Sequence, residues 1–346
     1  MEEESYKPRS IPIEGGDQVG KGDASDRLAA GLCEQGEDIV ITSFPNYATP
    51  SGTAIRHILC SGYKEFESIP EVKDAIGTVE QTKYVMALFA LNRLEHLSSL
   101  KRLAAEDKII LYDRSPYSNA LTIAYNMAAG VVKNTDIDSL VNEALSLDSL
   151  FIDQLNLKNC VLHLHQENST WVPLRNEKGD DKHETREVQD LCDDVFRRFG
   201  KIVGEGWHGV VTRKNDQWRD RKDIQNDILE FITSRMEIGR RGEKGSISYP
   251  TLDNYIGDLY PGVQIDPNRV VMWEDSIKEN NKQVMYASGI EIGHAISESI
   301  KEINLQPYVA GGMKMILDKY PECYSILSYF FGDEYPLKLC KAVNEA

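Results

Sequence analysis

Residues 11–21 read Ile-Pro-Ile-Glu-Gly-Gly-Asp-Gln-Val-Gly-Lys, an apolar run that passes into a glycine-spaced loop and ends in a lysine. The spacing of Gly15, Gly20 and Lys21 fits a phosphate-binding loop, in which backbone N–H groups curl around phosphate oxygens. The residues before the loop favour a strand and those after it a helix, as this motif requires. A nucleoside triphosphate is therefore expected at Gly15, Gly16, Gln18, Val19, Gly20, Lys21, Gly22 and Asp23.

The position after the lysine departs from the motif, which places a Ser or Thr there to bind Mg²⁺. This chain has Gly22 followed by Asp23 instead. Asp23 supplies an oxygen to Mg²⁺ in one interpretation, because this ion accepts carboxylates. In the other interpretation it only caps or charges the first turn of the helix. The sequence leaves both open.

Composition and charge exclude some classes of protein. The net charge of −16 and the pI near 5.0 argue against a nucleic-acid polymer as the main partner, because such proteins carry a basic face. Six scattered cysteines without a CxxC pair favour a reducing cytoplasm over a disulfide framework. No signal-peptide pattern and no run near the ~20 apolar residues of a membrane span is visible, so a protein that is neither exported nor membrane-bound is expected.

Short strand patterns alternate with helical ones along the first 240 residues. This alternation predicts an α/β protein with a doubly wound parallel sheet flanked by helices. The expected strands are 10–14, 38–43, 108–112, 159–165 and 208–212, and the expected helices are 24–35, 79–104, 136–153, 183–203 and 220–238.

A polar, glycine-spaced stretch at residues 239–246 has the composition of a linker. We therefore expect one domain at 1–240 and a mainly helical C-terminal appendage at 246–346, a size that suits a small domain. Within the appendage the patterns predict a short strand and two helices, at 269–273, 281–304 and 310–320. No motif in the appendage indicates a function.

Four segments carry a likeness to a known family. They are Glu14-Gly15-Gly16-Asp17, then Phe44-Pro45 with Gly52 and Ile55-Arg56, then residues 89–96, and finally Asp113-Arg114 with Ser118. In this order they resemble the thymidylate kinases, which are P-loop nucleoside monophosphate kinases. The likeness covers residues 11–125 and continues more loosely to about 238.

The resemblance implies roles for two pairs of residues. Phe89 and Arg93 lie four apart on an expected helix and so share one face. In the family, the aromatic ring stacks on the base and the arginine holds the acceptor phosphate. Asp113 and Arg114 end a strand where parallel sheets bind ligands. The resemblance implies that Arg114 contacts phosphate and that Asp113, like Asp23 a candidate magnesium ligand, lies near the ion.

Further roles on the acceptor side follow from the same resemblance. Asp17 would accept a hydrogen bond from the sugar, and Arg56 is a weaker candidate for the acceptor phosphate. Ser115 and Tyr125 do not fit the family's pattern, which leaves the preferred base open. The expected substrate-binding residues are Asp17, Phe44, Pro45, Arg56, Phe89, Arg93, Arg114 and Ser118.

Phosphoryl transfer needs positive charge around the moving group. Since Gln18 and Val19 in the loop are not arginines, a lid at about 171–185 is expected to supply that charge. Arg175 is the first candidate and Lys182 the second. The predicted catalytic residues are then Lys21, Arg93, Arg114, Arg175 and Lys182.

The sequence as a whole predicts a phosphotransferase that uses ATP and Mg²⁺ to convert dTMP to dTDP. A kinase of another nucleotide or nucleoside remains an alternative, as does a nucleotide-binding regulatory protein without turnover. The expected partner is a small-molecule nucleotide, and the family resemblance implies a homodimer.

Overall fold

The computed structural model of the chain describes residues 8–167, 172, 185–239, 243–252, 259–279 and 281–346. These residues form two compact units, each built from two segments of the chain. Unit 1 consists of Met1–Phe44 and Leu103–Ser248, and unit 2 of Pro45–Arg102 and Tyr249–Ala346. The domains expected at 1–240 and 246–346 divide the chain differently from these two units. That division remains a prediction.

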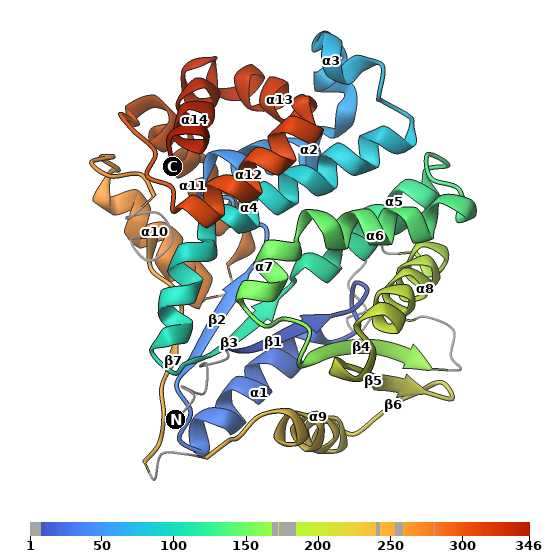
Figure 1. Cartoon of the computed structure of the whole chain (residues 1–346). Coiled ribbons are helices and arrows are strands. Elements are labelled where there is room, and N and C mark those ends of the chain that lie inside the picture. The colour runs from blue at the N-terminus through green and yellow to red at the C-terminus, as the bar shows by residue number, and fades with distance from the viewer. Residues whose placement is uncertain (1–7, 168–171, 173–184, 240–242, 253–258, 280) are drawn as a thin grey trace, which may run out of the picture. The chain divides into compact units, whose positions relative to one another are not determined.

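Unit 1 contains a seven-stranded sheet in the order β6-β5-β4-β1-β3-β2-β7 (Figure 1). All neighbouring strands are parallel except β5 and β6. The strands are β1 (Arg9–Glu14), β2 (Ile39–Ser43), β3 (Ile109–Asp113), β4 (Val161–Glu167), β5 (Trp207–Lys214), β6 (Gln217–Trp218) and β7 (Ile247–Ser248). The predicted α/β fold with its parallel sheet is confirmed.

The central strands are buried on both faces. Every residue of β1 is buried, and in β3 Ile109, Ile110, Leu111 and Tyr112 have no exposed surface. Strands of this kind belong to sheets that helices cover on both sides. Ile11 lies opposite Leu111, and Ile13 opposite Leu162, so the register places apolar side chains in one core.

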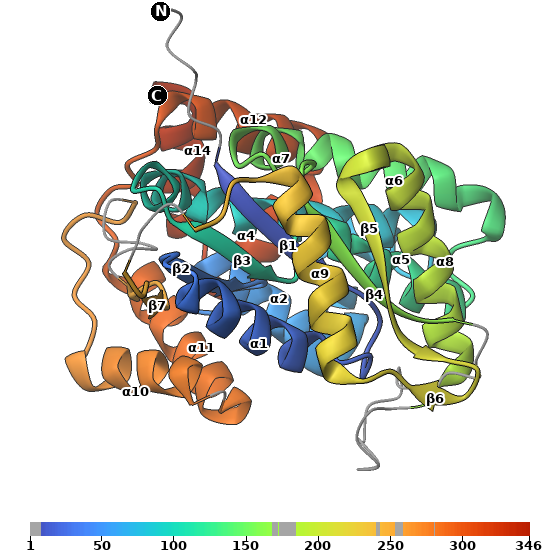
Figure 2. The same ribbon diagram turned by 90° about the horizontal axis from the view of Figure 1, so that it is seen from below.

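Helices of unit 1 cover the sheet. Helices α1 and α9 lie side by side on one face (Figure 2), where Leu28, Leu32, Ile228 and Ile232 join the strand residues in the core. Helices α5, α6 and α8 pack together as a second group. The bounds are α1 (Lys21–Glu34), α5 (Asn119–Ala128), α6 (Ile137–Leu147), α7 (Ser149–Gln154), α8 (Arg186–Val203) and α9 (Arg221–Arg235).

Unit 2 is helical in its described residues. The N-terminal part provides α2 (Pro50–Ser61), α3 (Pro70–Lys73) and most of α4 (Val79–Ala105). The C-terminal part provides α10 (Pro267–Lys278), α11 (Lys282–Ser299), α12 (Pro307–Lys319), α13 (Pro321–Phe331) and α14 (Glu334–Glu345). The predicted helical character of the C-terminal region is confirmed.

Some local predictions are wrong. Residues 269–273 lie in helix α10 rather than in a strand, because Asp266 caps the helix by accepting a hydrogen bond from Asn268 N at 2.9 Å and Pro267 occupies its first turn. The helix expected at 136–153 is divided at Asp148 into α6 and α7. The patterns also missed the two-residue strands β6 and β7.

The stretch expected to be a linker is anchored to unit 1 where it is described. Gly239 N donates to Glu37 Oε1 at 2.8 Å, and Gly245 N donates to Cys33 O at 2.9 Å. A Cβ atom on Gly245 would lie 2.0 Å from Glu37 O, so only glycine fits this approach. The following β7 then extends the sheet at β2. Among the described residues, no helix has the length and apolarity to cross a membrane.

Candidate active site

The loop between β1 and α1 has the backbone of a phosphate-binding loop. Gly15 and Gly20 have positive φ angles of 142° and 98°, and Gln18 also lies in the left-handed region at 57°. A Cβ atom on Gly15 would lie 2.4 Å from Leu164 O. Gly20 precedes the first residue of α1 and has no side chain to bond the N–H groups of the first helical turn. The loop and this helix end therefore present backbone donors to an anion.

Lys21 begins helix α1 and folds back over the loop. Its Nζ donates hydrogen bonds to Gly15 O at 3.0 Å and Gly16 O at 2.5 Å. Burial lowers the pKa of Lys21, and the nearby charge of Arg114 lowers it further, whereas carboxylates including Asp17 and Asp113 raise it. This places the ammonium group at the phosphate-binding loop, where the sequence predicted it.

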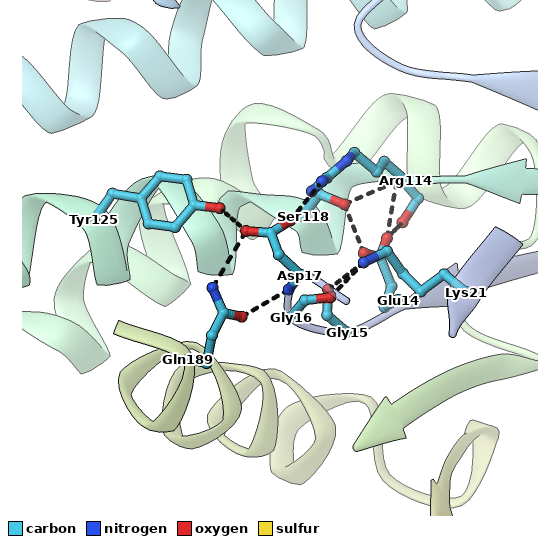
Figure 3. A network of polar contacts seen from close by, with 10 residues as sticks. Glu14, Gly15, Gly16, Asp17, Lys21, Arg114, Ser118, Tyr125 and Gln189 are labelled. Atoms are coloured by element: carbon cyan, nitrogen blue, oxygen red, sulfur yellow. Dashed lines mark hydrogen bonds and ion pairs between the residues drawn. The ribbon is translucent and has the colours of Figure 1, made fainter. Parts of the chain in front are cut away.

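Asp17 is the centre of a polar network on the same loop (Figure 3). Arg114 Nη2 donates to Asp17 Oδ1 at 3.1 Å, and Tyr125 OH donates to Asp17 Oδ2 at 2.5 Å. Gln189 Nε2 donates to the same Oδ2 at 3.2 Å, while Gln189 Oε1 accepts from Asp17 N at 2.6 Å. Burial alone would raise the pKa of Asp17, but Arg114, Lys21 and the hydrogen bonds lower it to about 2. The carboxylate is therefore ionised at neutral pH.

Arg114 follows the last residue of β3 and has a positive φ angle of 70°. Residues other than glycine rarely adopt this backbone, and such conformations concentrate at functional sites. Burial opposes the charge of Arg114, yet Asp17 and the carboxylates of Asp113 and Glu14 raise its pKa above the ordinary value. A fixed guanidinium thus lies beside the loop, in the region where parallel sheets bind ligands.

Glu14, at the end of β1, is buried and accepts three hydrogen bonds. Ser115 donates to Oε1 from its backbone N at 2.8 Å and from its hydroxyl at 2.5 Å, and Ser118 Oγ donates to Oε2 at 2.5 Å. Burial raises the pKa of Glu14 to about 7, although the two serines, Arg114 and Lys21 oppose the rise. In this structure Ser118 thus contacts Glu14, and its role in substrate binding remains a prediction.

The two candidate magnesium ligands have different surroundings. Asp23 Oδ2 lies 3.0 Å from Arg27 Nε and 3.7 Å from Arg221 Nε, which favours a role in charging the first turn of α1. Asp113 ends β3 and acts electrostatically on Lys21 and Arg114. Within the described part of the chain, no group of three His, Cys, Asp or Glu side chains is arranged to hold a metal. Of the two, Asp113 is better placed for an ion held mainly by phosphates and water.

The predicted site residues are divided between the two units. In unit 1, Phe44 is buried, its N donates to Asp113 O at 3.2 Å, and its ring packs edge-on against Phe151 at 5.7 Å. In unit 2, helix α4 carries Phe89, which is half-buried, and Arg93, which is 2% exposed. Pro45 and Arg56 also belong to unit 2. Arg175, Lys182 and most of the expected lid lie outside the described residues.

Sequence reasoning missed two residues of the Asp17 network. Gln189 lies 172 residues from Asp17 along the chain, and no local pattern connects them. Tyr125 drew notice only as a mismatch to the family pattern. It follows Ser118, the N-cap of α5, by seven residues, which is about two turns of helix, so the spacing did contain a signal that the two side chains lie on the same side of the segment.

A phosphate-binding loop between the first strand and first helix of a parallel sheet, with a lysine and an arginine gathered beside it, defines a P-loop nucleotide-binding protein. The family model described as thymidylate kinase matches residues 13–203, more than half of the chain. The chain therefore belongs to the thymidylate kinase family, whose members are nucleoside monophosphate kinases and thus phosphotransferases.

Individual known proteins also resemble the chain. The chain is 24% identical to a thymidylate kinase of Plasmodium falciparum over 236 residues, which cover 67% of this chain and 93% of the relative. A solved structure of thymidylate kinase from Candida albicans matches with a TM-score of 0.46 at 20% identity, covering 66% of this chain and 92% of the other. The family model ends at residue 203, so the C-terminal part of unit 2 lies beyond it.

Proposed function

We propose that the chain transfers the γ-phosphoryl group of ATP to dTMP, with Mg²⁺, and releases ADP and dTDP. The observation that carries the proposal is the Asp17–Arg114 pair beside the Lys21 loop, within a chain of the thymidylate kinase family. The loop glycines and the uncapped start of α1 suit the β- and γ-phosphates of ATP. Magnesium suits the same place when phosphate oxygens and water complete its coordination around Asp113.

The residues of unit 1 would act mainly by position and charge. Lys21 would neutralise the triphosphate, and Arg114 would bind phosphate oxygens through its planar guanidinium. Asp17 is an ionised acceptor for a sugar hydroxyl, and Tyr125 and Gln189 hold its carboxylate. No covalent intermediate is needed, because phosphoryl transfer depends on alignment and electrostatic stabilisation.

The remaining roles are proposals carried over from the family. Phe89 would stack on the base and Arg93 would hold the acceptor phosphate, with Pro45, Phe44 and Arg56 lining the pocket. Arg175 or Lys182 would bring a cation to the moving phosphoryl group. A homodimer and a cytoplasmic location also remain proposals. The comparisons lend no support to a regulatory protein without turnover or to another acceptor.

A panel of acceptors tests the proposal. The purified full-length chain is incubated with ATP, with and without Mg²⁺, and with each of several nucleoside monophosphates and nucleosides. We expect Mg²⁺-dependent formation of ADP and dTDP, with the highest kcat/KM for dTMP. A higher kcat/KM for another acceptor would identify that acceptor as the preferred substrate. ADP formation at the background rate with every acceptor would contradict the kinase function.

A further inference from the structure

The C-terminal part of unit 2 lies beyond the residues that the family model matches, yet it contributes to a buried polar cluster on helix α4. The centre of the cluster is Glu95, two residues after Arg93 and 6% exposed. Tyr260 and Tyr335, both buried, reach it from the C-terminal part. A buried carboxylate needs several hydrogen-bond donors. The residues that donate to Glu95 therefore help to hold helix α4 in place.

The C-terminal tyrosines contact one oxygen of Glu95. Tyr260 OH donates to Glu95 Oε1 at 3.2 Å, and Tyr335 OH donates to the same atom at 3.3 Å. The two hydroxyl groups are 3.2 Å apart. Burial raises the pKa of Glu95, while hydrogen bonds from Ser51, Thr49 and the two tyrosines lower it. The tyrosines therefore stabilise the carboxylate in its buried position.

The other oxygen of Glu95 forms a hydrogen bond with the first turn of helix α2. Ser51 Oγ donates to Glu95 Oε2 at 2.5 Å. Asn92, one helical turn before Glu95, accepts from Asn46 N at 2.9 Å and donates to Asn46 O at 3.0 Å and to Thr49 Oγ1 at 2.9 Å. Thr49 is in turn the N-cap of α2. Glu95 thus joins the C-terminal tyrosines to the segment that begins α2.

A second contact from the C-terminal part supports the same segment. Helix α11 approaches the start of α2 closely, because a Cβ atom on Gly293 would lie 2.0 Å from Thr53 Oγ1 and 3.0 Å from Thr49 O. Tyr286, on α11, lies with its ring centroid 4.2 Å from the Arg56 guanidinium. The helix that carries Arg56 is therefore held by α11 at one side and by the Glu95 cluster at its beginning.

From these contacts we propose that Tyr260 and Tyr335 are positioning residues of the acceptor site. By holding Glu95, they fix α4, which carries Phe89 and Arg93, against the turn and helix that carry Pro45 and Arg56. The C-terminal part is then a structural component of the acceptor-binding half, and the inference rests on the proposed dTMP kinase function. The tyrosines would act through Glu95 and Asn92 and not by touching a nucleotide.

Steady-state kinetics of the full-length double variant Tyr260→Phe/Tyr335→Phe test the inference. Both rings remain and only the donors to Glu95 are lost. We expect KM for dTMP to rise about tenfold, the size expected for lost hydrogen bonds to a charged group, while KM for ATP and kcat change by less than about twofold. Tyr329→Phe is the matched control, because that ring belongs to the same part of unit 2 and is 49% exposed.

A merely structural role would lower the Tm and leave KM for dTMP at the wild-type value, and this result would overturn the inference. Ser51→Ala, which removes the donor to the other oxygen of Glu95, should also raise KM for dTMP; an unchanged KM counts against the inference. Hydrogen exchange at residues 46–52 should be faster in the double variant, and equal exchange would contradict the coupling. A wild-type chain that does not phosphorylate dTMP at all would instead overturn the proposed function.

Discussion

Arg114 Nη2 lies 3.1 Å from Asp17 Oδ1, which joins the end of β3 to the phosphate-binding loop that follows β1. Both side chains are largely buried, with 30% and 15% of their surfaces exposed. Because Tyr125 and Gln189 hold the other oxygen of Asp17, the guanidinium has a fixed partner and a defined direction. In the proposed function, the pair would link the triphosphate side of the site to the sugar of the acceptor.

Replacing Arg114 with lysine tests that geometry, because the charge remains while the planar set of donors is lost. We expect kcat/KM for dTMP to fall by roughly tenfold to a hundredfold. Steady-state kinetics with varied dTMP provides the measurement. Arg269→Lys is the control, since Arg269 is a 43% exposed arginine that forms an ion pair with Glu291 at 3.3 Å. Equal kcat/KM values for the two variants would show that the Arg114 guanidinium does not bind phosphate in the reaction.

Replacing Lys21 with methionine removes the ammonium group from the phosphate-binding loop. Since this cation is placed to stabilise charge on the transferred phosphoryl group, we expect kcat to fall by about a hundredfold or more. The matched control is Lys108→Met, because Lys108 forms an ion pair with Glu106 near the start of β3 and is not part of the loop. Wild-type kcat in the Lys21 variant would contradict the assignment of this loop as the catalytic one.

The strands and the loop could be predicted because their signals are local. The apolar run at 109–112 forms a fully buried strand, and Gly15 and Gly20 have the backbone that the motif needs. The contact of Gln189 with Asp17 could not be predicted, because it depends on how α8 packs in unit 1. Helix α10 was mistaken for a strand because Val270 and Val271 have a high strand propensity, which the capping Asp266 and Pro267 override.

Contacts between segments that lie far apart in the sequence could not be predicted from local patterns either. The glycine-rich stretch at 239–246 has the composition of a linker, and composition does not reveal that Gly245 packs against Glu37. Likewise, no spacing in the sequence connects Glu95 to Tyr335, whose hydrogen bond spans 240 residues. Contacts between distant segments depend on tertiary packing, which overrides what each segment indicates alone.

The dependence on Mg²⁺ should distinguish Asp113 from Asp23. Asp113→Asn removes a carboxylate that acts on Lys21 and Arg114, so we expect the Mg²⁺ concentration for half-maximal activity to rise about fivefold or more. Asp23→Asn removes exposed ion pairs with Arg27 and Arg221 and should leave that concentration within about twofold of wild type. Titrating Mg²⁺ at fixed ATP and dTMP measures both. The opposite ranking would identify Asp23 as the ligand.

Glycine positions in unit 2 give a prediction about stability. A Cβ atom on Gly52 would lie 1.8 Å from Asn46 O, so Gly52→Ala forces apart the turn that Asn92 holds and should destabilise the fold by about 2–4 kcal/mol. Apart from its chain neighbours and the backbone of its own helix, no atom of the described residues lies within 4 Å of the ideal Cβ position of Gly311, in α12. Gly311→Ala should therefore stabilise the chain by about 0.5–1 kcal/mol. Urea unfolding measures both, and a neutral Gly52→Ala would contradict the close packing.

The buried Glu14 predicts how stability depends on pH. Its pKa is about 7 in the folded chain, above the ordinary 4.5, because burial disfavours the charged form. The folded state therefore holds this proton more tightly than the unfolded state does. The resulting stability is fully present below about pH 4.5 and is lost as the pH rises through about 7. The difference corresponds to a loss of at most about 3 kcal/mol.

The variant Glu14→Gln removes this titration while keeping a side chain of similar size. Between pH 5 and pH 8, the free energy of unfolding of the wild type should fall relative to that of the variant by about 2–3 kcal/mol. Urea unfolding of both proteins across this range, at constant ionic strength, measures the gap. The control variant is Glu71→Gln, which removes an exposed carboxylate in the first turn of α3. A constant gap between the wild type and Glu14→Gln would show that Glu14 titrates at its ordinary pKa, with its charge satisfied by Ser115 and Ser118.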